Sequence, residues 1–182
     1  MTALFSFYRA AADRLEQAEW LLPTLAHLLF AGILLMYFWV SGLTKLGEGF
    51  GGVFSPSTGA YVQIFPRLME AVGYDTTQFS TLHRLVVLAG TWAEFILPAL
   101  IVLGLLTRLA ALGMIGFIAV QSLTDLYGHN GWADPKVIGG WFDRFPDGII
   151  LDQRALWVFV LMVLVLKGAG PLSFDRALGM HR

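Results

Sequence analysis

The segment LHRLVVLAGTWAEFILPALIVL, residues 82–103, decides the fold class of this chain. At a rise of about 1.5 Å per residue it is long enough to cross a hydrocarbon core of about 30 Å. Glu94 lies in the middle of this segment. A carboxylate at that depth costs about 2.5 kcal/mol or more to insert, so such groups are rare and usually have a partner or a function. Glu94 is therefore the first candidate for a functional residue.

The composition of the whole chain agrees with a membrane protein. Of 182 residues, 57% are hydrophobic and 14% are charged, with a mean hydropathy of +0.67. Soluble domains carry about 25% charged residues, which they need for a polar surface. The absence of cysteine excludes disulfides, thiolate nucleophiles and cysteine-ligated iron–sulfur clusters. A net charge of −1 gives no reason to expect a nucleic-acid partner.

Three further apolar segments have the length and composition of membrane spans. Short connections favour antiparallel neighbours, and the turn at Thr107 and Arg108 is short. Pro98 predicts a kink in the second span. We therefore expect an all-α, polytopic, antiparallel four-helix bundle in residues 21–175, with spans at about 21–43, 82–103, 109–126 and 154–170.

The segments outside the spans are predicted to be partly helical. In residues 1–20, apolar residues such as Leu4, Ala11 and Leu15 recur at helical spacing between charged ones. This pattern indicates an amphipathic helix that lies at the membrane surface or packs on a neighbouring protein. The long first loop predicts a short interfacial helix that covers one end of the bundle, and residues 176–182 form a tail.

Four spans place both termini on the same side of the membrane. Lysine and arginine divide equally between the two sides, but long loops count for less in orientation. Arg108 occupies the short turn between the second and third spans. We therefore expect the termini to be cytoplasmic.

Three segments together resemble the signature segments of the DoxX family. They are WVSGLTKL at residues 39–46, AEFILPALIVLGLLTRLAAL at 93–112 and GAGPLSFD at 168–175. The resemblance implies a four-helix bundle in a bacterial or archaeal cytoplasmic membrane. It also implies association with quinone-linked redox systems such as thiosulfate:quinone oxidoreductase. The long first and third loops depart from the shortest members, and the resemblance transfers no set of catalytic residues.

Glu94 and His27 form the candidate proton relay. Helical rise places His27 about 9 Å and Glu94 about 13 Å from the inner ends of their spans. If these two spans pack together, the side chains could meet and pass a proton to a quinone oxygen. Alternatively, Glu94 only ties helices together through Ser, Thr, Trp or backbone groups.

A second group of polar residues lies where the spans end under the two long loops. These residues are candidates for binding a quinone headgroup, a small anion or a docked protein. Alternatively they are polar because helix ends meet water. The candidate ligand-binding residues are Ser41, Lys45, His83, Gln121 and Asp125.

Resident metal cofactors are not expected. His27 and His83 are about 20 Å apart along the membrane normal, which argues against a bis-histidine haem. His129 with Asp125 or Asp134 makes only a weak metal site.

The leading function is a membrane subunit of a quinone-linked oxidoreductase that contacts the lipid bilayer and anchors a soluble redox subunit or a larger membrane complex. Whether the chain is itself an enzyme stays open. Two alternatives are a non-catalytic accessory subunit, which predicts no cavity at Glu94, and a module for metal stress or small-solute handling. The latter predicts a polar path from the outer residues to Glu94.

Overall fold

The computed structural model describes residues 2–180 and confirms an all-α bundle. The last two residues of the expected tail at 176–182 lie outside the described part. No strand occurs in residues 2–180. Four helices are long and apolar enough to cross a membrane, and they are Leu21–Lys45, Thr81–Leu103, Thr107–Gly128 and Ile149–Lys167.

Three of the four spans combine α-helix with a π-helical segment. The first span consists of α2 (Leu21–Leu29), η1 (Phe30–Leu34) and α3 (Leu35–Lys45). The second is the single helix α6 (Thr81–Leu103). The third consists of α7 (Thr107–Leu123) and η4 (Thr124–Gly128), and the fourth of η6 (Ile149–Arg154) and α9 (Ala155–Lys167). The fourth span begins at Ile149 rather than near residue 154, and it ends before Gly168, which has a φ of +76°.

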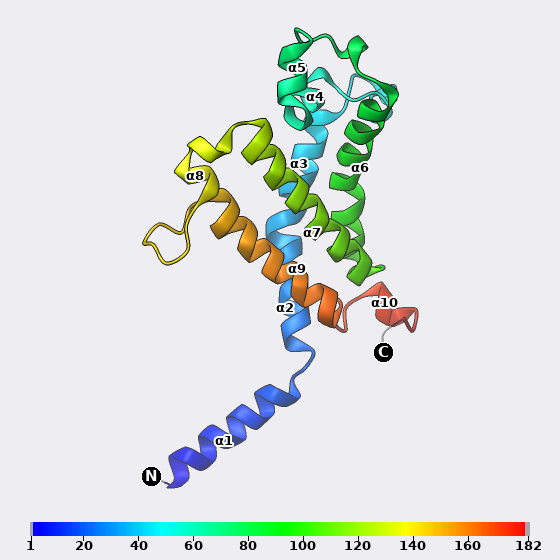
Figure 1. Ribbon diagram of the computed structural model, residues 1–182. Coiled ribbons are helices and arrows are strands. Elements are labelled where there is room, and N and C mark those ends of the chain that lie inside the picture. The colour runs from blue at the N-terminus through cyan, green and yellow to red at the C-terminus, as the bar shows by residue number, and fades with distance from the viewer. Residues whose placement is uncertain (1, 181–182) are drawn as a thin grey trace.

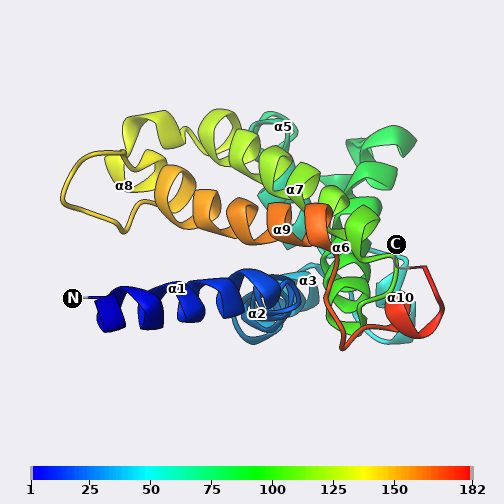
Figure 2. The same ribbon diagram turned by 90° about the horizontal axis from the view of Figure 1, so that it is seen from below.

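The spans form two antiparallel pairs that cross each other (Figures 1 and 2). One pair is α3 with α6, and the other is α7 with α9. The pairs contact each other where α6 packs on α7 and α2 packs on α9. Both termini lie at one end of the bundle, here named the terminal end, and α1 (Thr2–Gln17) extends away from it. The opposite end, here named the loop end, carries α4 (Thr58–Ile64) and α5 (Pro66–Ala71).

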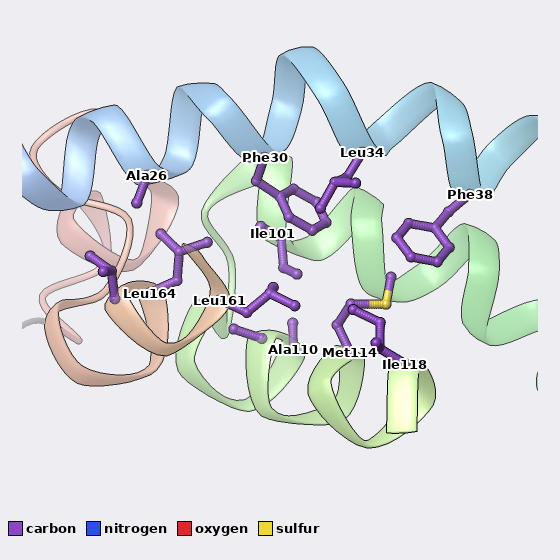
Figure 3. Packing of buried hydrophobic residues seen from close by; sticks show 12 residues of the cluster. Ala26, Phe30, Leu34, Phe38, Ile101, Ala110, Met114, Ile118, Leu161 and Leu164 are labelled. Atoms are coloured by element: carbon purple, nitrogen blue, oxygen red, sulfur yellow. The ribbon is translucent and has the colours of Figure 1, made fainter. Parts of the chain in front are cut away.

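The main core is a stripe of first-span residues that points at the other three spans (Figure 3). A four-residue step overshoots one α-helical turn by about 40°, so three such steps rotate a face by about 120°. The π-helical η1 takes more residues per turn and absorbs part of this rotation. The stripe consists of Ala26, Phe30, Leu34 and Phe38, and its partners include Ile101, Met114, Ile118, Leu161 and Leu164.

The expected short helix of the first loop is two helices. α4 ends at Ile64 because Pro66 disfavours helical backbone at the residue before it, which is Phe65. α4 and α5 form a second small core with the start of α6, and this core contains Ala60, Tyr61, Met69, Phe79 and Val87. We name α4 and α5 the lid, because they lie over the loop end of α3 and α6.

Short helices order the remaining loops. They are η2 (Phe50–Val53), η3 (Thr76–Gln78), η5 (Gly131–Ala133), α8 (Pro135–Ile138) and α10 (Phe174–Ala177). Before η3, Asp75 accepts hydrogen bonds from the Thr77 hydroxyl and amide, and these bonds lower the pKa of the Asp75 carboxyl. At the terminal end, the Asp175 carboxylate accepts hydrogen bonds from the amides of Leu106 and Thr107 at 2.7 and 2.8 Å. These two amides belong to the start of α7 and have no partner within the helix, so Asp175 caps it.

Candidate functional site

Glu94 is buried in α6 and forms an ion pair with Lys45 of α3. The Lys45 ammonium nitrogen lies 2.9 Å from each carboxylate oxygen of Glu94. The hydroxyl of Ser41 donates to the same carboxylate at 3.1 Å and accepts from Lys45 at 2.8 Å. Glu94 is 2% exposed and Lys45 is 5% exposed. The carboxylate placed in the membrane therefore has a cation and a hydroxyl as partners.

Close approach of α3 and α6 brings these groups together. Ser41 and Lys45 are four residues apart on α3, so both side chains project from one face. Gly42 lies between them, and a Cβ on it would stand 2.7 Å from the Phe95 ring. The indole of Trp39 donates to the Phe95 carbonyl at 3.2 Å. A glycine and a cross-helix hydrogen bond thus hold α3 against the turn of α6 that carries Glu94.

Pro98 removes one backbone hydrogen bond from the turn of α6 that carries Glu94. Proline has no N–H, so Pro98 cannot donate to the carbonyl of Glu94, four residues earlier. Pro98, at which the sequence predicts a kink, lies inside α6 and is buried. It withholds one helical hydrogen bond from the residue that carries the buried carboxylate.

A cavity of about 500 Å³ begins at Glu94 and lies between α6 and α7. It exists because the two helices present small residues to each other, and these are Ala89, Gly90, Ala93, Gly113 and Gly116. A Cβ on Gly116 would meet nothing within 4 Å. The cavity wall also includes Val86 and Val120, which are 44% and 63% exposed on the outer surface of the two spans. In a bilayer this side of the cavity faces lipid.

Polar groups line the cavity from Glu94 to the loop end. Lys45 and Ser41 lie beside Glu94, whereas Gln121 and Asp125 come from the third span. At the loop end, His129 and Gln63 of the lid also line the cavity, and the His129 ring nitrogen Nε2 lies 3.1 Å from the Gln63 carbonyl. One continuous cavity therefore connects the buried ion pair to the lid.

A second ion pair holds Asp125 in place. Arg154 lies 2.6 Å from the Asp125 carboxylate and also donates to the Ser122 hydroxyl at 3.0 Å. Arg154 is only 4% exposed. The two residues lie in η4 and η6, and π-helical segments occur frequently at functional sites. This pair is not among the sequence predictions, although Asp125 ends one span where Arg154 begins the next.

The structure brings four of the five candidate ligand-binding residues to one cavity with Glu94. These four are Ser41, Lys45, Gln121 and Asp125. His83 does not line the cavity. Its ring packs edge-on against Phe65 and Phe79, with Nδ1 2.8 Å from the Ser80 hydroxyl. Its position at the start of α6 places it in the contact between that helix and the lid.

His27 does not meet Glu94, which corrects the expected pairing. His27 Nε2 lies 3.0 Å from the Val102 carbonyl, an acceptor that needs the ring nitrogen to carry the proton. Val102 lies about 12 Å beyond Glu94 along α6. The expected depths assumed that the two spans end at the same level, whereas α2 begins roughly one and a half turns beyond the end of α6. His27 thus satisfies one of the last carbonyls of α6.

The arrangement suits proton exchange and hydrogen bonding to a neutral or anionic oxygen. Lys45 donates, the Glu94 carboxylate accepts and is a group that can bind a proton, and Ser41 both donates and accepts. Within residues 2–180, no group of three or more His, Cys, Asp and Glu side chains is arranged to hold a metal ion.

Four membrane-length helices packed in antiparallel pairs define a multi-pass α-helical membrane protein. The DoxX family model matches residues 26–124, and the chain belongs to this family. The DoxX family is a family of membrane proteins, in agreement with the four membrane-length helices. The match includes Ser41, Lys45, Glu94 and Gln121, and it ends one residue before Asp125. No curated protein and no solved structure matches the chain.

Proposed function

We propose that this protein is a membrane subunit of a quinone-linked oxidoreductase system in the bacterial cytoplasmic membrane, and that the cavity beside Glu94 binds the quinone. One observation carries the proposal: a buried Lys45–Glu94 pair lies in the wall of a cavity that is otherwise mainly apolar and faces lipid. Sites for small molecules combine an apolar lining with a few convergent polar groups. A quinone has a polar ring and an apolar tail, and it reaches its site through the bilayer.

The chemistry of quinone reduction fits the groups of the cavity. Conversion of a quinone to a quinol takes two electrons and two protons. Lys45 donates a hydrogen bond to one ring oxygen, and Glu94, with Ser41 as its neighbour, takes up a proton from water at the loop end and passes it to that oxygen. The other ring oxygen takes the second proton from water. The electrons come from a reduced soluble redox subunit that the protein anchors. In this scheme Lys45 and Ser41 replace His27 as the partners of Glu94 in the relay.

Quinone binding can be tested directly with purified protein in lipid nanodiscs. Decylubiquinone is titrated while quenching of tryptophan fluorescence is recorded, because Trp39 and Trp92 lie on the helices that carry the site. We expect saturable quenching, weakened about tenfold in Lys45→Met through loss of a charged hydrogen bond. Lys136→Met, at an exposed position in α8, should bind as the wild type does. Non-saturable quenching, or equal affinity in Lys45→Met, would overturn the proposal.

A small-solute module is the second candidate, because the same cavity extends from Glu94 to Gln63 and His129 at the loop end. Such a module needs a path for water-soluble molecules. The variant Ala93→Cys distinguishes the two, since Ala93 lines the cavity and the chain has no other cysteine. Rapid reaction with a membrane-impermeant thiol reagent favours the solute module. Reaction only with a lipid-soluble maleimide favours the quinone site. The cavity at Glu94 also disfavours a purely structural accessory subunit.

A further inference from the structure

A separate cavity of about 370 Å³ lies at the terminal end of the bundle. Its walls come from the junction of α1 with α2 and from the chain that follows α9. Gly170 shapes the wall: its φ is +80°, and a Cβ there would stand 2.7 Å from the Thr24 hydroxyl oxygen. The cavity shares no lining residue with the cavity beside Glu94, so the two are separate sites.

Unpaired hydrogen-bond donors converge on this second cavity. Lys167 and Arg176 line the cavity and are exposed. Neither side chain has an ion-pair or hydrogen-bond partner within the described part of the chain. The indole of Trp20 and the amide of Gln17 also lack partners there. Glu19 is the one carboxylate among the lining residues. Two cations against one anion leave the cavity with a net positive charge.

The cavity lies at the level where membrane spans end. Trp20 directly precedes the first residue of α2, and Lys167 is the last residue of α9. Tryptophan and lysine at such positions mark the headgroup region of a bilayer. Leu22, Leu166 and Leu172, each adjacent in sequence to a lining residue, are 54%, 64% and 73% exposed. A molecule held there would have its charged part on the cations and an apolar surface beside it.

We propose that this cavity binds the phosphate headgroup of an anionic phospholipid from the leaflet on the side of the termini. Lys167 and Arg176 contact the phosphate oxygens, and Trp20 donates from its indole. The exposed leucines lie along the acyl chains. An anionic headgroup fits better than a zwitterionic one, because an added ammonium group would meet two cations and only one carboxylate.

Native mass spectrometry of the purified full chain in detergent tests this site. Phosphatidylglycerol is titrated in parallel with phosphatidylcholine, and retained lipid is counted. We expect preference for phosphatidylglycerol, and about 30-fold weaker binding in the Lys167→Gln, Arg176→Gln double variant. The control is Lys136→Gln with Arg144→Gln, which removes the same charge from exposed positions at the loop end. Both double variants alter exposed side chains, so both should fold.

The source of the phosphate is decided in the same experiment. Glycerophosphoglycerol, the deacylated form of phosphatidylglycerol, offers the same phosphodiester charge without acyl chains. If it binds as tightly as phosphatidylglycerol, the site serves a free phosphate compound and the lipid assignment is overturned. Equal binding of phosphatidylcholine would also overturn the lipid assignment. So would an equal loss of affinity in the loop-end control, because the two cations would then act only through their charge and not as a site.

Discussion

Lys45 and Glu94 each carry a charge that is expensive to place inside a bilayer. Together they form an ion pair with two oxygen contacts of 2.9 Å, and Ser41 supplies a further hydrogen bond. Removal of one partner leaves the other charge buried and unpaired, which costs more than the pair contributes. Stability and function are therefore linked at these residues. Glu94 makes the cavity polar, and it is stable in the membrane because Lys45 pairs with its charge.

The Lys45–Glu94 pair should behave as one unit in a double-mutant cycle. We expect Glu94→Gln and Lys45→Met each to lower the free energy of unfolding by about 3 kcal/mol, because each leaves an unpaired buried polar group. The double variant should lose clearly less than the sum. Unfolding in mixed detergent micelles measures these values. Additive losses, or single variants as stable as Lys136→Met, would contradict a coupled pair.

His27 should matter for stability and not for the cavity. The variant His27→Phe keeps the ring shape but leaves the Val102 carbonyl without its donor, so we expect a loss of about 1 kcal/mol in unfolding free energy. Quinone affinity measured by fluorescence quenching should stay unchanged, because the ring lies about 12 Å along α6 from Glu94. A loss of quinone affinity as large as that of Lys45→Met would return His27 to the proton relay.

At the scale of elements, the cavity depends on the absence of large side chains where α6 faces α7. Two antiparallel helices that meet through alanine and glycine would normally pack closely. Here they leave a space between them, with the lid at one end of the cavity and the Lys45–Glu94 pair in its wall. The π-helical η4 and η6 add the Asp125–Arg154 pair on the third and fourth spans. The shape of the site thus follows from small residues on α6 and α7 and from π-helical turns in the third and fourth spans.

The variant Gly116→Leu should fill the cavity from the α7 side. A Cβ at Gly116 meets nothing within 4 Å, so the larger side chain enters open space with little cost in stability. We expect quinone affinity to fall at least about tenfold because the cavity loses volume. The free energy of unfolding should change by less than about 1 kcal/mol. Gly32→Leu is the matched control, since a Cβ there also meets nothing and Gly32 does not line the cavity. Equal effects of the two substitutions would argue against the cavity as the binding site.

At the scale of the whole molecule, two antiparallel pairs give the protein two different ends. The terminal end holds both chain termini and the turn that Asp175 caps, whereas the loop end carries the lid (Figure 1). The cavity beside Glu94 reaches the loop end, and the second cavity, lined by Lys167 and Arg176, lies at the terminal end. The orientation of the bundle therefore decides which aqueous compartment each cavity adjoins.

Single cysteines can report that orientation, because the natural chain has none. Phe142→Cys lies in the long loop between the third and fourth spans and is fully exposed, and Ala177→Cys lies in α10 near the C-terminus. With cytoplasmic termini, an impermeant maleimide should label Phe142→Cys in intact cells and Ala177→Cys only after permeabilisation. The reverse pattern would invert the topology, and labelling of both in intact cells would contradict four spans.

Length and hydropathy were sufficient to predict the fold class. A segment of about 20 apolar residues has no stable place except across a bilayer, where its backbone must be helical. The short turn at Thr107 and the position of Glu94 within a span could also be predicted, because each depends only on nearby residues in the sequence. The segment boundaries were predicted less accurately, because backbone conformation at Gly168 ends α9 and Pro66 divides the lid into two helices.

The partners of the buried groups were decided only by tertiary structure. Depths estimated from the sequence predicted that Glu94 pairs with His27, but the first two spans end at different levels in the membrane. The carboxylate instead pairs with Lys45, which lies at the loop end of α3. The union of Ser41, Lys45, Gln121 and Asp125 with Glu94 in one cavity likewise depends on which helix faces pack together. Hydrophobicity fixes how many times a chain crosses the membrane. Rotation and relative shift of the helices fix which polar groups meet, because these depend on packing between residues far apart in the chain.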